Sequence, residues 1–133
     1  MNRPSVRPIA LLAVGCALSV MCQRRASPAR DVAVEWSMTP ARAVVGAPAR
    51  GEIRLSDANG KPIGGAKLRL ESHMSHPGMR PVIADMTERR EGVYEARWRF
   101  TMRGDWILLV IGTLPDGRRI NREIEVPNVQ PPG

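Results

Sequence analysis

The amino-acid sequence predicts an all-β fold: an immunoglobulin-like antiparallel β-sandwich of about seven strands, preceded by an N-terminal export or anchor segment. Three observations support this. Short segments with alternating apolar and polar residues recur about every ten residues. Turn residues, mainly glycine, proline and asparagine, separate them. After residue 31 no stretch has the periodicity of a helix. The 133 residues are enough for one domain with one hydrophobic core.

The N-terminus has the pattern of an export signal. A short basic segment, "MNRPSVRP", is followed by "IALLAVGCALSVMC", an uncharged and mostly apolar run at residues 9–22. This run has the length of a signal-peptide apolar region and is short for a transmembrane helix. We therefore expect residues 1–22 to be a signal peptide or a membrane anchor. The body of the protein would then lie in the periplasm or at the outer face of a membrane.

Both cysteines of the chain lie in this segment. Cys16 follows a small residue in "LAVGC", which resembles a lipoprotein processing site, although little apolar sequence precedes it. Cys22 ends "LSVMC", which has the better length, but Met21 is a poor residue before a lipidated cysteine. The alternative is that both are simply small apolar residues of the segment. The body from Asp31 onward has no cysteine, which excludes an intramolecular disulfide and a thiolate metal site there.

The charge distribution argues against a nucleic-acid-binding protein. The net charge is +7, but residues 1–30 contain five arginines and no acidic residue. Residues 31–133 contain 15 basic and 13 acidic residues. A body so nearly balanced lacks the electrostatic footprint that binding to a phosphate backbone requires.

After a charged tether at residues 23–31, the strands of the first half can be read from their alternation. "VAVEWSM" at 32–38 and "GEIRLSD" at 51–57 alternate, and "DANGKPIGGA" then supplies a turn. "AKLRLESHM" at 66–74 should place Leu68, Leu70, Ser72 and Met74 on one face.

The second half continues in the same way. "PVIADMT" is a short strand candidate and "ERREG" a polar turn, and "VYEARWRFTM" is the clearest strand, with Tyr94, Ala96, Trp98, Phe100 and Met102 on one face. "WILLVIGT" reads as a central strand buried on both sides. "RRINREIEV" closes the sandwich, which we place at residues 32–127, and residues 128–133 are expected to be a disordered tail.

Four stretches in this order, "NGKPIGGAKLRLE", "HMSHPGM", "EGVYEARWRFTMRGDWILLV" and "REIEV", resemble a YtkA-like domain over about residues 31–127. That family is related to the periplasmic part of FixH-type proteins. The resemblance implies an exported or membrane-anchored β-sandwich with no known catalytic chemistry. It also implies a link to copper, because FixH-type relatives are associated with copper handling during assembly of a haem–copper oxidase.

The segment "ESHMSHPGM" at residues 71–79 contains the only two histidines of the chain. Pro77 and Gly78 suit the central positions of a type II turn, which would bring His76 close to Met79. His73 could join them from the end of the preceding strand. Imidazole and thioether groups suit copper, so these three residues are the candidate metal ligands.

Two other methionines near this segment are weaker candidates. Met74 shares a face with apolar strand residues and is expected to pack in the core, and Met86 could lie on either face of its strand. The histidines could also be ordinary exposed residues of a loop.

The sequence thus predicts a non-catalytic cell-envelope domain, a copper carrier, buffer or metalloprotein-assembly accessory. No serine or cysteine nucleophile stands in a recognisable setting with a histidine base, so we expect no enzyme. Contact with the membrane would be made only through the N-terminal segment. The alternative is a metal-free module that binds another envelope protein through its loops or edge strands.

Overall fold

The structure is a computed structural model, and it describes residues 28–133. The predicted signal or anchor segment and both cysteines lie outside these residues. Within the described part of the chain there is no helix able to span a membrane.

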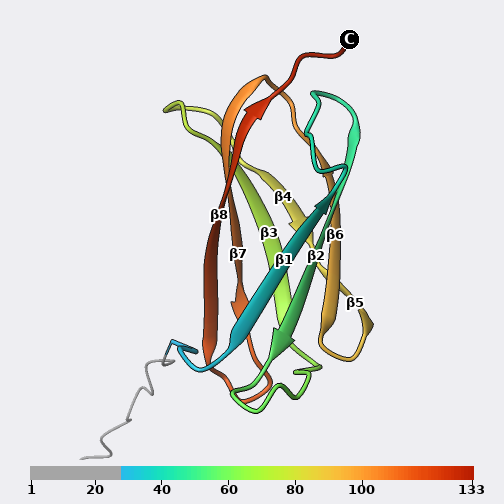
Figure 1. The fold of residues 1–133 in the computed structure, drawn as a ribbon. Coiled ribbons are helices and arrows are strands. Elements are labelled where there is room, and N and C mark those ends of the chain that lie inside the picture. Colours follow the sequence, from blue (N-terminus) through green and yellow to red (C-terminus); the bar gives the residue numbers. More distant parts are fainter. Residues whose placement is uncertain (1–27) are drawn as a thin grey trace, which may run out of the picture.

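The described residues form eight strands in two four-stranded sheets (Figure 1). The strands are β1 (Ala33–Thr39), β2 (Pro48–Ser56), β3 (Lys67–Met74), β4 (Val82–Asp85), β5 (Thr87–Arg90), β6 (Val93–Arg99), β7 (Gly104–Thr113) and β8 (Arg119–Val129). One sheet has the order β1-β2-β6-β5 and the other the order β4-β3-β7-β8. Every ladder between neighbouring strands is antiparallel.

This order confirms the predicted immunoglobulin-like sandwich. In spatial order the strands β1-β2-β6-β5 correspond to strands A, B, E and D of that fold, and β3, β7 and β8 correspond to strands C, F and G. β4 is an additional strand beside β3. The connections from β2 to β3, from β4 to β5 and from β6 to β7 cross between the two sheets.

The eighth strand is β5, which the sequence had predicted as a polar turn. All four residues of β5 are exposed, so it has no apolar alternation from which a strand could be recognised. It is an edge strand, held by backbone pairing to β6 with an irregular register between Glu88 and Arg90.

The alternation predicted for the other strands is largely confirmed. In β3, Leu68, Leu70 and Ser72 are buried, and Met74 packs against the core. The core lies between the sheets, and its fully buried members of large volume are Tyr94, Phe100, Ile53, Leu55, Leu70, Leu108, Val110 and Val129.

Three details differ from the sequence prediction. β7 was expected to be buried on both sides, but only its inward-facing residues are buried. No further layer covers its outer face, so Ile107, Leu109 and Ile111 remain half-buried there. Met102 does not continue the buried face of β6; the strand ends before it and its side chain is 43% exposed. At the C-terminus, β8 extends to the buried Val129, and Gln130 N donates to Ala43 O at 3.0 Å, so ordered structure continues beyond residue 127.

An aromatic seam of four rings connects the two sheets. The Trp36 and Trp98 ring centroids are 6.2 Å apart, Trp98 and Phe100 are 5.7 Å apart, and Phe100 and Trp106 are 5.3 Å apart. The last two pairs meet edge to face, which is a favourable geometry for aromatic rings. Because Trp106 is on β7 and the other three rings are on or next to the first sheet, the seam passes from one sheet to the other.

The seam depends on a glycine. Gly51 lies in β2 beneath Trp36, and a Cβ atom built on it would be 2.2 Å from Cη2 of Trp36 and 3.0 Å from Cζ3 of Trp98. No side chain can occupy this position unless the indole of Trp36 moves.

Tyr94 fixes the crossover connection between β2 and β3. Its hydroxyl group donates a hydrogen bond to Ile63 O at 2.8 Å and accepts one from Ala66 N at 3.0 Å. The side chain is fully buried. Burial raises the pKa of the Tyr94 phenol, and the negative charge of Glu88 raises it further, against the opposing effect of the hydrogen bond from Ala66.

We predict that Gly51→Ala lowers the free energy of unfolding by about 1–3 kcal/mol, because the methyl group forces Trp36 out of its packing position. Chemical denaturation followed by tryptophan fluorescence measures this. Ser37→Ala, on the outer face of the neighbouring strand, is the control and should change stability by less than about 0.5 kcal/mol. Equal stability of the two variants would contradict the close approach of Trp36 to residue 51.

We also predict that the ionisation midpoint of Tyr94 in the folded protein lies above pH 10.0, the ordinary pKa of tyrosine. Tyr94 is the only tyrosine, so ultraviolet absorbance reports on it alone. The unfolded chain ionises first, and the free energy of unfolding should therefore fall as the pH rises above about 10. A folded-state midpoint at or below the ordinary value would show that the phenol is not buried as described.

Candidate functional site

The histidine–methionine segment forms the end of β3 and the connection to β4 (Figure 1). The turn predicted at Pro77 and Gly78 is present, and Gly78 has a φ of 87°, the positive value that its position in a type II turn requires. The connection is fixed at its start, where Ser75 donates to Asp105 O through its backbone N at 3.2 Å and its hydroxyl at 3.0 Å. Its first residue is thus held against the start of β7, while residues 75–81 are exposed.

His73 is oriented by a charged row on the outer face of β3. Its Nε2 lies 3.1 Å from Oε2 of Glu71, and the other carboxylate oxygen of Glu71 lies 2.7 Å from Nη2 of Arg69. An ionised carboxylate only accepts hydrogen bonds, so the proton of the neutral imidazole is on Nε2 and the lone pair is on Nδ1. Glu71 therefore fixes both the tautomer and the orientation of the ring.

The other candidate ligands lie in different surroundings. His76 is exposed in the turn, and the Met79 side chain is 45% exposed. Met74 packs against the core next to Gly104, where its Cε would be 3.3 Å from an added Cβ. Met86 also packs against the core, and its N donates to Leu68 O, five residues along β3 from His73.

The structure thus groups His73 with Glu71 and leaves His76 and Met79 exposed in the adjoining turn, with Met74 and Met86 directed to the core. In residues 28–133, no three histidine, cysteine, aspartate or glutamate side chains are grouped as they would be around a metal ion.

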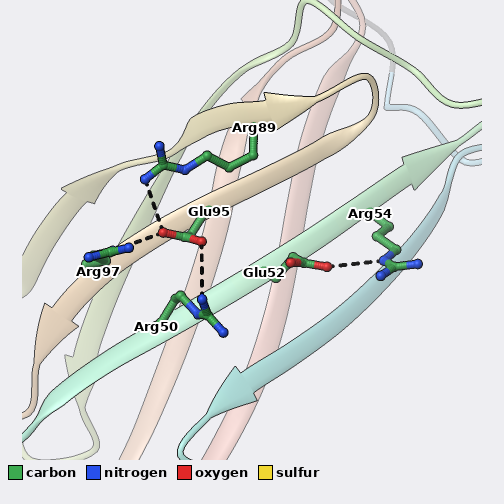
Figure 2. A network of polar contacts seen from close by, with 6 residues as sticks. All are labelled: Arg50, Glu52, Arg54, Arg89, Glu95 and Arg97. Atoms are coloured by element: carbon green, nitrogen blue, oxygen red, sulfur yellow. Dashed lines mark hydrogen bonds and ion pairs between the residues drawn. The ribbon is translucent and has the colours of Figure 1, made fainter.

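A second polar cluster surrounds Glu95, a residue that the sequence did not single out (Figure 2). Oε1 of Glu95 accepts hydrogen bonds from Arg97 Nε at 2.9 Å and Arg89 Nη2 at 3.2 Å, and Oε2 lies 3.8 Å from Nη1 of Arg50. The three arginines come from β6, β5 and β2, and Glu95 points outward from the sheet. Although it is on the outer face, only 9% of its side chain is exposed, and each of the three arginines is at least half exposed.

The arginines hold the pKa of Glu95 below its ordinary value of 4.5, mainly through the hydrogen bond from Arg97, with smaller contributions from Arg89. Glu95 therefore stays ionised and keeps the guanidinium groups gathered around it. Alternation in "EARWR" already places Glu95 and Arg97 on one face of β6. The contributions of Arg50 and Arg89 depend on the register of β2 and β5 against β6, which no local pattern specifies.

The family model of YtkA-like domains matches residues 27–110. The chain belongs to the YtkA-like family. The matched part includes both the histidine–methionine turn and the Glu95 cluster, and it ends within β7, before β8. No curated protein sequence matches this YtkA-like chain.

Solved structures share the fold of this YtkA-like domain. A DUF4426 family protein from Pseudomonas aeruginosa superposes with a TM-score of 0.55 at 12% identity, covering 78% of this chain and 94% of that one. A DUF4785 family protein from Legionella pneumophila gives a TM-score of 0.53 at 16% identity, covering 76% of this chain. The YtkA-like domain spans only 29% of the Legionella chain, so it corresponds to one part of a larger protein there. At these identities the likeness concerns the fold alone.

We predict that Glu95→Gln destabilises the domain at neutral pH, because it removes the charge that compensates three neighbouring arginines. Because the pKa of Glu95 is lowered by folding, its stabilising effect is present above pH 4.5 and is lost as the pH falls through the folded-state value. The gap in denaturation midpoint between wild type and variant should therefore narrow in acid, and also in high salt.

Glu125→Gln is the matched control for this measurement. Glu125 is an exposed glutamate on β8, on the other sheet, and takes part in no ion pair within residues 28–133. If Glu125→Gln lowered stability at neutral pH as much as Glu95→Gln does, the arginines around Glu95 would not be the cause of its effect on stability.

Proposed function

We propose that this YtkA-like protein is a non-catalytic, exported domain of the cell envelope that holds copper in the cuprous state at its histidine–methionine turn. It would act as a carrier, a buffer or an accessory in metalloprotein assembly. His73, His76 and Met79 would be the ligands, supplying two imidazoles and one thioether. This donor set suits the cuprous ion, which accepts soft thioether ligands and low coordination numbers.

The observation that carries the proposal is the hydrogen bond between His73 and Glu71. Metal-binding histidines commonly donate their second ring N–H to a carboxylate, which fixes the tautomer and strengthens the ligand. Glu71 does this at 3.1 Å, so that the unprotonated Nδ1 of His73 is available. The exposure of His76 and Met79 adds support, since neither side chain would have to leave the core to reach a metal.

We predict that replacing His73, His76 and Met79 together by alanine abolishes cuprous binding without unfolding the domain. The measurement is a competition titration with cuprous ion against a chromophoric chelator. It should be made in a chain with Cys16 and Cys22 replaced by serine, because thiolates bind the same ion tightly. Circular dichroism before the titration verifies the fold.

Two single substitutions sharpen the result. Met102→Ala removes a methionine whose exposure, 43%, matches that of Met79, and it should leave the affinity unchanged. Glu71→Gln removes the carboxylate beside His73 and should weaken binding by about 10- to 100-fold. An affinity that the triple variant leaves unaltered would refute the copper proposal.

A second candidate function, a metal-free protein-interaction module, is favoured by a separate observation. The outer face of the β4-β3-β7-β8 sheet carries a row of apolar side chains on β7, namely Ile107, Leu109 and Ile111, and Ile83 on β4 is 56% exposed. Apolar side chains at the surface are typical of the centre of a protein interface. A chain that does not compete for cuprous ion and that binds an envelope protein through this face would support the second candidate.

A further inference from the structure

The outer face of the β1-β2-β6-β5 sheet is covered by arginines. Strand alternation and register place six of them there: Arg50 and Arg54 on β2, Arg97 and Arg99 on β6, and Arg89 and Arg90 at the irregular end of β5. Three acids share the face, Glu35, Glu52 and Glu95. The six cations and three anions leave this arginine face with a charge of +3.

The opposite outer face differs in sign. On the β4-β3-β7-β8 sheet the outward charged residues are Lys67, Arg69 and Arg119 against Glu71, Asp85, Glu123 and Glu125, three cations against four anions. The positive charge of the sandwich is therefore concentrated on one broad side.

The positive charges are crowded at the centre of the arginine face. Arg50 is directly opposite Arg97 across the β2–β6 ladder, and like charges in that position oppose pairing. Glu95 alone compensates both of them together with Arg89 (Figure 2). A guanidinium group has five N–H donors, and one carboxylate has about four acceptor positions, so most donors of the three groups are not used by Glu95. The Arg97 side chain is 71% exposed.

The remainder of the arginine face indicates what kind of partner it fits. Between the charged side chains it carries small or polar residues, namely Ala33, Ser37, Thr39, Ser56 and Thr87. Its two other uncharged residues are Pro48 at one end of β2 and Val93, which is buried. The exposed large apolar side chains in residues 28–133, Met79, Ile83 and Met102, lie elsewhere. The centre of a protein–protein interface is normally apolar, and this face has no such centre. Adsorption to an anionic bilayer needs only cations arranged on a surface.

We propose that the arginine face binds the anionic phospholipid headgroups of a membrane surface, with Arg50, Arg89, Arg97 and Arg99 as the contacting residues. Guanidinium groups pair with phosphate through two parallel hydrogen bonds, which suits them to headgroup phosphates. Glu95 acts as a positioning residue, since it gathers three of the guanidinium groups without neutralising them. The arginine face would add a second membrane contact to the one that the sequence led us to expect at the N-terminal segment alone. This inference is independent of copper binding at the turn, which lies on the other sheet.

The first test is arginine footprinting of the full chain with phenylglyoxal, read residue by residue by mass spectrometry. The chain is bound to vesicles of phosphatidylcholine alone or with phosphatidylglycerol. We expect the modification rates of Arg50, Arg89, Arg97 and Arg99 to fall several-fold on the anionic vesicles only. Arg119, on the opposite outer face, is the internal reference and should react equally on both. Equal rates for the arginine face on both kinds of vesicle would overturn the proposal.

The second test compares two double variants of the full chain by their partition ratio between anionic and zwitterionic vesicles. Arg97→Gln with Arg99→Gln should lower the ratio about fivefold for each arginine removed. Lys67→Gln with Arg119→Gln removes the same charge from the other sheet and should leave the ratio near that of the wild type. All the proteins compared carry the same N-terminal segment, so its contribution to the partition ratio cancels when the variants are compared with the wild type.

Two further outcomes would reject the proposal, the first from the partition ratios and the second from the footprinting. Equal ratios for the two double variants would mean that overall charge, and not this face, determines binding. Protection of the same arginines by inorganic phosphate alone, at the concentration of the lipid phosphate, would mean that the site takes a small free anion and not a membrane surface.

Discussion

The contact between the aromatic seam and Gly51 is the constraint on which the rest of the sandwich depends. Residues 31–133 contain no cysteine, so no disulfide joins the two sheets as it does in antibody domains. The seam replaces that link, because Phe100 meets Trp98 on one side and Trp106 on the other. It also determines where the first sheet ends, because Trp106 Nε1 donates to Met102 O at 3.0 Å and closes the connection between β6 and β7.

The sequence predicts the sandwich well because most strands bury one face only. Alternation therefore identifies the inward residues of β1, β2, β3 and β6, including Tyr94 and Ser72, without reference to any partner. β5 escapes prediction because it is an edge strand, held by backbone hydrogen bonds with no buried side chains. For β7 the sequence predicts too much burial. A continuous apolar run indicates a strand buried on both sides, but the outward apolar residues of β7 are not covered by any other layer.

The two candidate sites differ in how far local sequence determines them. His73, His76 and Met79 lie within one strand end and one turn, so their proximity in the chain is visible in the sequence, as is the turn at Gly78. Glu71, the partner of His73, is only two residues away in the sequence. That both side chains point outward follows from the alternation of β3. The Glu95 cluster is assembled from three strands that are up to 47 residues apart, from Arg50 to Arg97. Its recognition requires the register of the ladders, which a single sequence does not contain.

Both sites use the outer faces of the sheets, which the core does not constrain. The inward residues of β3 and β6 are committed to packing, whereas the outward residues can change without altering the fold. The sandwich therefore offers two surfaces of different chemistry on one scaffold, an arginine-rich side and a side with acids and apolar residues. In such a fold, function depends on which side chains the outer faces carry and not on the strand topology.

The pairing of β8 with β7 protects an edge of the most apolar strand in the sandwich. Within residues 28–133, β8 alone covers that edge of β7, and its own end is held by backbone hydrogen bonds between Gln130 and residues 43 and 45. Without β8, the apolar β7 would have an open edge that could pair with another chain. A break in the chain between Thr113 and Arg119 would therefore expose β7 to aggregation.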